Sequence, residues 1–188
     1  MIDLVTIHGI KDTTDARGYA SALKVPHREL HWADMAPAGY VCDVASYRGA
    51  LRKRVVYRIA QQINFLRPRV VLAHSLGSVV MLDVIRWHGV RFKHLITIGS
   101  PLANSLYSDC RSGLPFGRLS WLNIYAEADL IAYPNLWSAT PGDLLSSIAE
   151  FKRLGVRDEV IDGGNAWVAH SSYWAHATVQ KRIEERLN

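Results

Sequence analysis

The chain has 188 residues, of which 49% are hydrophobic and 21% are charged, and its mean hydropathy is close to zero. This length and balance predict one domain with a single core, and they exclude a disordered chain and integral membrane association. The formal net charge is +5, but the basic residues are densest on one predicted helix, where a solvated face explains them, so we expect no nucleic-acid partner.

Short apolar runs alternate with longer helical patterns along the chain, which predicts a parallel sheet with helices on its faces. Six strands are expected, at Asp3–Ile7, about Arg28–Trp32, Val70–Ala73, Leu95–Ile98, Trp121–Tyr125 and about Glu159–Ile161. Four helices are expected, at Tyr47–Leu66, Leu76–Trp87, Asp143–Leu154 and Ser171–Leu187. The segment from Gly99 to Ser120 is rich in Ser, Gly and Pro and is expected to be mainly loop.

The most informative motif is Ala73-His74-Ser75-Leu76-Gly77, which joins an apolar strand directly to an apolar helix. It matches the nucleophile elbow Gly-x-Ser-x-Gly, except that Ala73 replaces the first glycine. Small flanking residues are required because the serine occupies a tight, strained turn. That turn raises the Ser75 hydroxyl above the sheet edge and directs the Leu76 N–H toward a developing oxyanion. For these five residues alone, the alternative is an ordinary strand-to-helix turn.

A serine hydroxyl needs a base to remove its proton, and the base needs an acid to orient it. Behind such an elbow, the acid and then the histidine follow along the chain. Asp129 follows the fifth expected strand and is the preferred acid. Glu127 in the same loop stays open as an alternative, whereas Asp143 fits a helix N-terminus better. His170 is the preferred base because it precedes the final expected helix, whereas His176 falls inside that helix.

A second oxyanion donor is expected from the loop after the first strand. Gly9 lets the backbone approach a substrate closely, and the Ile10 N–H is the candidate donor beside the Leu76 N–H. The alternative is that His8-Gly9 is only a turn. Residues near the predicted site edge form a candidate substrate pocket, unless they simply pack the rim of the core: His8, Gly9, Tyr107, Phe116, Leu136, Trp137 and Trp167.

These motifs resemble the α/β-hydrolase superfamily, and its small lidless lipases and esterases in particular. The resemblance covers almost the whole chain, from His8-Gly9-Ile10 through the elbow to His170. The segment Thr97-Ile98-Gly99-Ser100-Pro101-Leu102 also resembles the strand and loop of many lipase-like hydrolases.

The resemblance implies a three-layer α/β/α fold with a mostly parallel six-stranded sheet in the order 2-1-3-4-5-6. It implies a single domain over residues 1–188 without a cap domain. It also implies a catalytic triad of Ser75, His170 and Asp129. The substrate does not follow from the fold, because the same fold supports many chemistries.

The predicted reaction is acyl transfer to water, with Ser75 attacking the carbonyl of a small-molecule or lipid ester. A thioesterase or amidase with the same triad is one alternative, and a non-catalytic binding protein of the same fold is another. A basic protein that binds an anionic polymer or membrane surface ranks last.

Cys42 and Cys110 share no metal or redox spacing, which favours free thiols in a reducing compartment. Residues 1–9 contain no basic leader or long apolar stretch, so we expect no signal peptide and a cytoplasmic location. His27 and His31 are four residues apart, but no Cys or carboxylate cluster joins them. We therefore expect neither a metal nor a cofactor.

Overall fold

A six-stranded sheet runs through the centre of the computed structural model, which describes residues 2–9, 19–30, 32, 47, 49, 51–103, 119–132 and 152–188. The strands are β1 (Leu4–Ile7), β2 (Arg28–Leu30), β3 (Val70–His74), β4 (His94–Ile98), β5 (Ser120–Ala126) and β6 (Arg157–Ile161). Their order is β2-β1-β3-β4-β5-β6, and every pairing is parallel. All six strands lie where the sequence predicts them, and the strand order that the family resemblance implies is confirmed.

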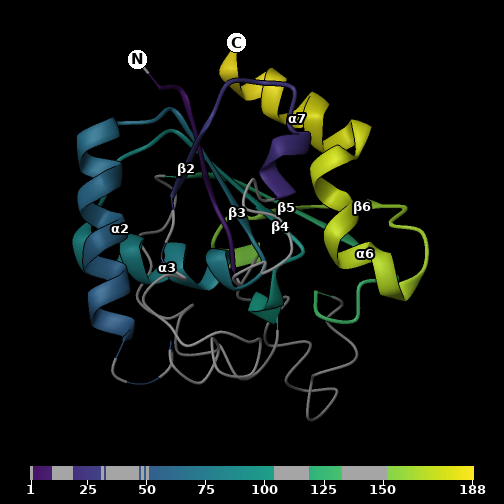
Figure 1. Cartoon of the computed structure of the whole chain (residues 1–188), viewed down its shortest axis with the longest axis horizontal. Helices are drawn as coiled ribbons and strands as arrows, with labels where there is room; N and C mark the ends of the chain where they lie inside the picture. The colour runs from purple at the N-terminus through teal and green to yellow at the C-terminus, as the bar shows by residue number, and fades with distance from the viewer. Residues whose placement is uncertain are drawn as a thin grey trace.

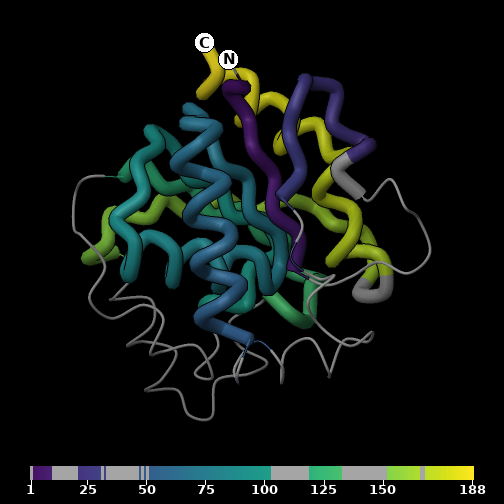
Figure 2. Tube along the Cα trace, turned by 60° about the vertical axis from the view of Figure 1, so that its left-hand side comes forward, coloured from purple at the N-terminus to yellow at the C-terminus, as the bar shows by residue number. Residues whose placement is uncertain are grey.

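Helices cover both faces of this sheet (Figure 1). One face carries α2 (Arg52–Leu66) and α3 (Leu76–His88), while the other carries α6 (Ala166–Ser172), η6 (Tyr173–Ala175) and α7 (Ala177–Leu187). The short η1 (Tyr19–Ala22) packs beside η6. Figure 2 shows from a second side that α2 and the C-terminal helices lie on opposite sides of the strands. The three layers predicted from the sequence are therefore present.

The core is divided into two parts by the sheet, because successive side chains of a strand point to opposite faces. Along β3, Val71 and Ala73 pack toward α2 and α3. Val70 and Leu72 pack toward α7 and η6 instead. All four side chains are buried, which explains why this strand reads as a continuous apolar run.

Helix α2 begins at Arg52 rather than at the predicted Tyr47. Tyr47 is itself helical, but Gly49 and Leu51 lie in turns before α2 begins. The helix ends where Arg67 adopts a left-handed conformation (φ 48°) in front of Pro68. Its start is anchored to α3, because buried Asp83 accepts two hydrogen bonds of 2.8 Å from the Arg52 guanidinium.

The predicted final helix, Ser171–Leu187, is wrong as a single element. The chain instead forms α6, η6 and α7 in succession. His176 has extended backbone angles (φ −69°, ψ 129°) and caps α7 by accepting a hydrogen bond from the Thr178 N–H. His170, expected in a loop, lies within α6. No glycine or proline marks these breaks in the sequence.

Two predicted helix ends agree with the described structure. Helix α3 ends at His88, followed by Gly89 at φ 57°. Of the predicted helix Asp143–Leu154, only its last residues are described, and Gly155 follows them at φ 73°. The expected loop after Gly99 opens with the short η3 (Pro101–Ala103). Within the described part of the chain, no helix combines the length and apolarity needed to span a membrane.

Candidate active site

Strand register brings the residues of the candidate site to one edge of the sheet. Ile7 of β1 pairs with Ala73 of β3, and Ala73 pairs in turn with Thr97 of β4. The residues two positions beyond these partners are Gly9, Ser75 and Gly99. Because all strands are parallel, these three residues meet at the carboxyl edge, where ligands bind in open α/β sheets.

Ser75 occupies a strained turn between β3 and α3. Its backbone angles are φ 53° and ψ −130°, a region that non-glycine residues rarely occupy. The turn is held by a hydrogen bond of 3.1 Å from the Ser75 N–H to the Ile98 carbonyl. The buried Ser78 hydroxyl donates to the Ser75 carbonyl, and its oxygen lies 2.7 Å from Ser100 Oγ. The serine conformation is thus held by the end of β4 and by the first turn of α3.

Gly77 allows the start of α3 to approach β1. A Cβ at this position would lie 2.6 Å from the Ile7 carbonyl oxygen and 3.0 Å from the His8 carbonyl. A backbone carbonyl cannot move aside as a flexible side chain can, so a larger residue would push α3 away. This contact is the physical reason for glycine after the serine.

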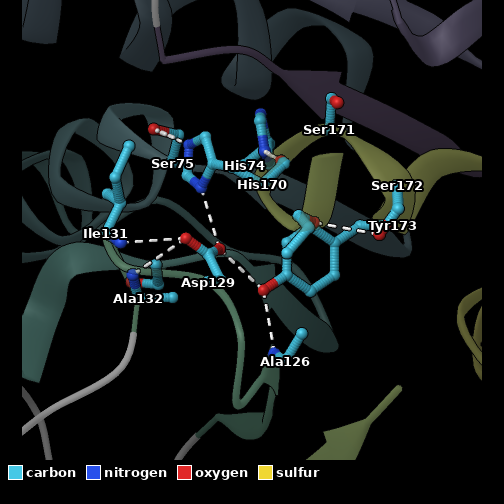
Figure 3. Close-up of polar contacts among 12 residues, drawn as sticks. His74, Ser75, Ala126, Asp129, Ile131, Ala132, His170, Ser171, Ser172 and Tyr173 are labelled. Atoms are coloured by element: carbon cyan, nitrogen blue, oxygen red, sulfur yellow. Dashed lines mark hydrogen bonds and ion pairs between the residues drawn. The ribbon is translucent and has the colours of Figure 1, made fainter. Parts of the chain in front are cut away.

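The structure brings Ser75, His170 and Asp129 together (Figure 3). Ser75 Oγ lies 2.9 Å from Nε2 of His170, and the opposite ring nitrogen, Nδ1, lies 2.8 Å from Oδ2 of Asp129. Ser75 and Asp129 are buried, whereas the His170 side chain is 23% exposed. The imidazole is therefore the member of the three that reaches solvent.

The Asp129 carboxylate is surrounded by donors. Oδ2 accepts from the Tyr173 hydroxyl at 2.7 Å, and Oδ1 accepts from the backbone N–H groups of Ile131 at 2.9 Å and Ala132 at 3.3 Å. Burial raises the pKa of Asp129, but hydrogen bonds and charge from His170, with those from Tyr173 and Ile131, more than offset it. The net pKa lies below the usual value, so the group is an ionised acceptor.

This ionisation fixes the roles of the two imidazole nitrogens. An ionised carboxylate only accepts hydrogen bonds, so Nδ1 of His170 must donate to Asp129. In the neutral ring, Nε2 then carries a lone pair directed at the Ser75 hydroxyl. Glu127, the alternative acid, is exposed and makes no hydrogen bond or ion pair with His170 within the described part of the structure. Geometry thus favours Asp129 over Glu127 at this position.

His74 is a neighbour of the site to which the sequence motif assigns no role. Its Nε2 lies 2.8 Å from the His170 carbonyl oxygen and donates to it, and the two rings lie 4.8 Å apart. Burial, followed by the charges of His170 and His8, lowers the pKa of His74 well below its usual value. A neutral His74 thus holds the backbone that carries the proposed base.

Gly99 and Tyr173 were also missed by sequence reasoning. Gly99 has φ 54°, and a Cβ there would lie 2.8 Å from Cε2 of Tyr173 and 3.2 Å from both Asp129 Oδ2 and His170 Nδ1. Glycine therefore leaves room for the contact between acid and base. The segment around Gly99 resembles a strand and loop of lipase-like hydrolases, but the sequence alone assigned Gly99 no role. No sequence pattern indicated that the Tyr173 hydroxyl would contact the acid.

Gly9 lies directly against the elbow. A Cβ on Gly9 would lie 2.4 Å from the Leu76 nitrogen and 2.9 Å from Ser75 Cβ. Glycine thus leaves the space in front of the Leu76 N–H open, on the side where the Ser75 side chain begins. The other proposed donor, Ile10, lies outside the described residues.

The predicted pocket residues are only partly described. His8 stacks on Trp174 with ring centroids 4.6 Å apart, and its carbonyl accepts a hydrogen bond of 2.7 Å from Trp32 Nε1. Trp167 belongs to α6, but its side chain lies outside the described part of the structure. The remaining pocket candidates also lie outside it: Tyr107, Phe116, Leu136 and Trp137. Among the described residues, no group of three metal-ligating side chains could hold a metal ion.

No protein-family model matches the sequence, and no curated protein matches it significantly. Solved structures do match. A protein assigned as a YdeN-like hydrolase from Pectobacterium atrosepticum aligns with a TM-score of 0.65 at 10% identity, covering 99% of this chain and 90% of that chain. A protein from Xanthomonas campestris, assigned to the alpha/beta hydrolase superfamily, gives 0.58 at 17% identity over 97% and 98% of the two chains.

A further match is the S-formylglutathione hydrolase of Staphylococcus aureus. It aligns with a TM-score of 0.56 at 15% identity, over 100% of this chain and 82% of that chain. At such low identities the similarity is one of fold. Sheet order, elbow and structural neighbours agree, and the chain therefore has the α/β-hydrolase fold that its motifs predict.

Proposed function

We propose that the protein is a serine hydrolase that cleaves carboxylic esters through an acyl-enzyme on Ser75. The observation that carries this proposal is the continuous contact from Ser75 Oγ to His170 Nε2 at 2.9 Å and from His170 Nδ1 to Asp129 at 2.8 Å. Each group has the neighbour that its role requires. A binding protein of this fold would not need the aligned hydroxyl, imidazole and carboxylate.

In the first half of the reaction, Ser75 Oγ attacks the ester carbonyl while His170 Nε2 takes the hydroxyl proton. Asp129 stabilises the imidazolium that forms. The Leu76 N–H, with the Ile10 N–H as second donor, stabilises the negative charge that develops on the carbonyl oxygen. The imidazolium then gives its proton to the departing alkoxide, which leaves as an alcohol, and the acyl group stays on Ser75.

In the second half, water attacks the acyl carbon. His170 takes a proton from the water, and the carboxylic acid is released as Ser75 Oγ recovers its proton. The imidazole is partly exposed, so solvent water reaches the ring of the proposed base.

A thioester is the second candidate substrate. The structural neighbour from Staphylococcus aureus is a hydrolase of S-formylglutathione, and this compound is a thioester. A matched oxygen ester and thioester that carry the same acyl group would separate the two candidates. The bond with the larger kcat/KM identifies the preferred chemistry.

A fluorophosphonate probe tests the proposal directly, since it reacts only with an activated serine. Wild type should be labelled, whereas Ser75→Ala should not be labelled and should lose several powers of ten in kcat on p-nitrophenyl esters. Ser171→Ala is a matched control, because its Oγ donates to the Val168 carbonyl at 3.2 Å and does not contact the proposed base through its side chain. Equal labelling or equal rates in wild type and Ser75→Ala would overturn the assignment.

A further inference from the structure

Tyr173 is not one of the three proposed catalytic residues, yet its hydroxyl contacts their acid. It donates to Asp129 Oδ2 at 2.7 Å and accepts from the Ala126 N–H at 2.9 Å (Figure 3). The whole side chain is buried. Because the Ala126 N–H occupies the acceptor side of the oxygen, the hydroxyl proton is directed at the carboxylate.

The carboxylate oxygen that Tyr173 binds is the one that His170 binds. Oδ2 of Asp129 receives both the tyrosine hydroxyl at 2.7 Å and Nδ1 of His170 at 2.8 Å. Two donors thus share the charge of one oxygen. A carboxylate that is stabilised by a second hydrogen bond is a weaker base toward the first donor.

The surrounding residues fit this shared contact closely. Gly99 has no side chain at the point where a Cβ would meet Tyr173 Cε2 at 2.8 Å and Asp129 Oδ2 at 3.2 Å. Burial, followed by the nearby charge of Asp129, raises the pKa of Tyr173, so its hydroxyl keeps its proton and stays a donor. The tyrosine can therefore donate throughout a catalytic cycle.

We infer that Tyr173 is a positioning residue that keeps Asp129 ionised and oriented, and that thereby limits how strongly Asp129 holds the protonated His170. The catalytic consequence rests on the proposed function. During turnover His170 alternates between its neutral and protonated forms, whereas the tyrosine contact persists. Without the hydroxyl, Asp129 would become more basic and would retain the imidazolium to higher pH.

The direct test is Tyr173→Phe, which keeps the ring that packs against Gly99 and removes only the hydroxyl. Ser172→Ala is the matched control, because it deletes a neighbouring hydroxyl that donates to the Ala169 carbonyl at 2.9 Å and not to Asp129. In Tyr173→Phe, we expect the acid limb of kcat/KM to move upward by roughly half a pH unit, with kcat reduced several-fold and KM nearly unchanged. Ser172→Ala should keep the wild-type pH profile.

A second measurement does not depend on activity. In a Ser75→Ala background, the Asp129 carboxyl is titrated by ¹³C NMR and identified by the signal lost in Asp129→Asn. Tyr173→Phe should raise the Asp129 pKa by about one unit. If wild type fails to react with a fluorophosphonate, the serine-hydrolase proposal falls, while this titration still decides the role of Tyr173.

A third variant covers the case in which Tyr173→Phe does not fold. Site-specific 3-fluorotyrosine at position 173 has a more acidic hydroxyl and is a stronger donor, so it should lower the Asp129 pKa. The inference is supported if the two substitutions shift the Asp129 pKa in opposite directions. It is also supported if only the fluorotyrosine protein folds and its Asp129 pKa is lower than that of the wild type. An unchanged Asp129 titration in the variants that fold would overturn it and would leave Tyr173 with a packing role only.

Discussion

Gly9→Ala should impair catalysis more than its small size suggests. The added methyl group would lie 2.4 Å from the Leu76 nitrogen and 2.9 Å from Ser75 Cβ. Both neighbours belong to the rigid elbow, so the methyl group must cover the Leu76 N–H or displace the end of β1. Either outcome removes or misplaces one oxyanion donor. Loss of one such donor costs about 10²–10³ in kcat, or roughly 3–4 kcal/mol of transition-state stabilisation.

The assay is kcat on a short p-nitrophenyl ester, with thermal unfolding followed by circular dichroism. Gly89→Ala is the control, because its Cβ would meet nothing within 4 Å although its φ is +57°. This control should cost about 1 kcal/mol of stability and leave kcat unchanged. If Gly9→Ala keeps wild-type kcat, or loses activity only in proportion to its unfolded fraction, the assignment of the Leu76 N–H is refuted.

Three further predictions concern charged or titratable groups. Asp129→Asn should lower kcat by about 10³–10⁴-fold, because an amide favours the wrong imidazole tautomer. Glu127→Gln, at an exposed position, should not change kcat. The reverse result would make Glu127 the acid. Asp83→Ala should lower the free energy of unfolding, measured in urea, by about 3–5 kcal/mol, since it leaves the partly buried guanidinium of Arg52 without its carboxylate. An unchanged urea midpoint would contradict this. Burial and neighbouring imidazoles lower the pKa of His74 well below 6.5 in the folded protein, so the unfolded chain protonates this imidazole more readily. The free energy of unfolding should therefore fall as the pH drops below 6.5, by up to about 1.4 kcal/mol per pH unit. His74→Gln should flatten that slope, and an equally steep slope in the variant would exclude His74 as its source.

The strands were predictable because each is a short apolar run, which is a local signal. Their order was implied by the resemblance to the α/β-hydrolase superfamily, and it agrees with the general rule that helical connections restrict how parallel strands can pair. The relative positions of Ser75, Asp129 and His170 follow from that topology, since each comes after a strand whose end lies at the same edge. The serine motif and the chain order of acid and base therefore predicted the three side chains that meet in the candidate site.

The contacts around the acid and base could not be read from the sequence, because they join residues that are far apart in the chain. Tyr173 reaches Asp129 across 44 residues, and His74 reaches the His170 carbonyl across 96. Neither residue has a spacing that distinguishes it from an ordinary core aromatic or a buried histidine. The break at His176 was missed for a related reason. The helix is interrupted there by a capping imidazole, which sequence patterns do not mark as they mark glycine or proline.

The departure at Ala73 shows why one small residue of the elbow can change while the other should not. Ala73 lies within β3, and its methyl group packs into the core between the sheet and the helices α2 and α3. Gly77 lies on α3, where a methyl group would meet the Ile7 carbonyl oxygen at 2.6 Å. One position faces side chains that can adjust, whereas the other faces backbone that cannot. Gly77→Ala should therefore displace α3, move the Leu76 N–H with it, and reduce kcat. A fully active Gly77→Ala would show that the elbow tolerates this displacement.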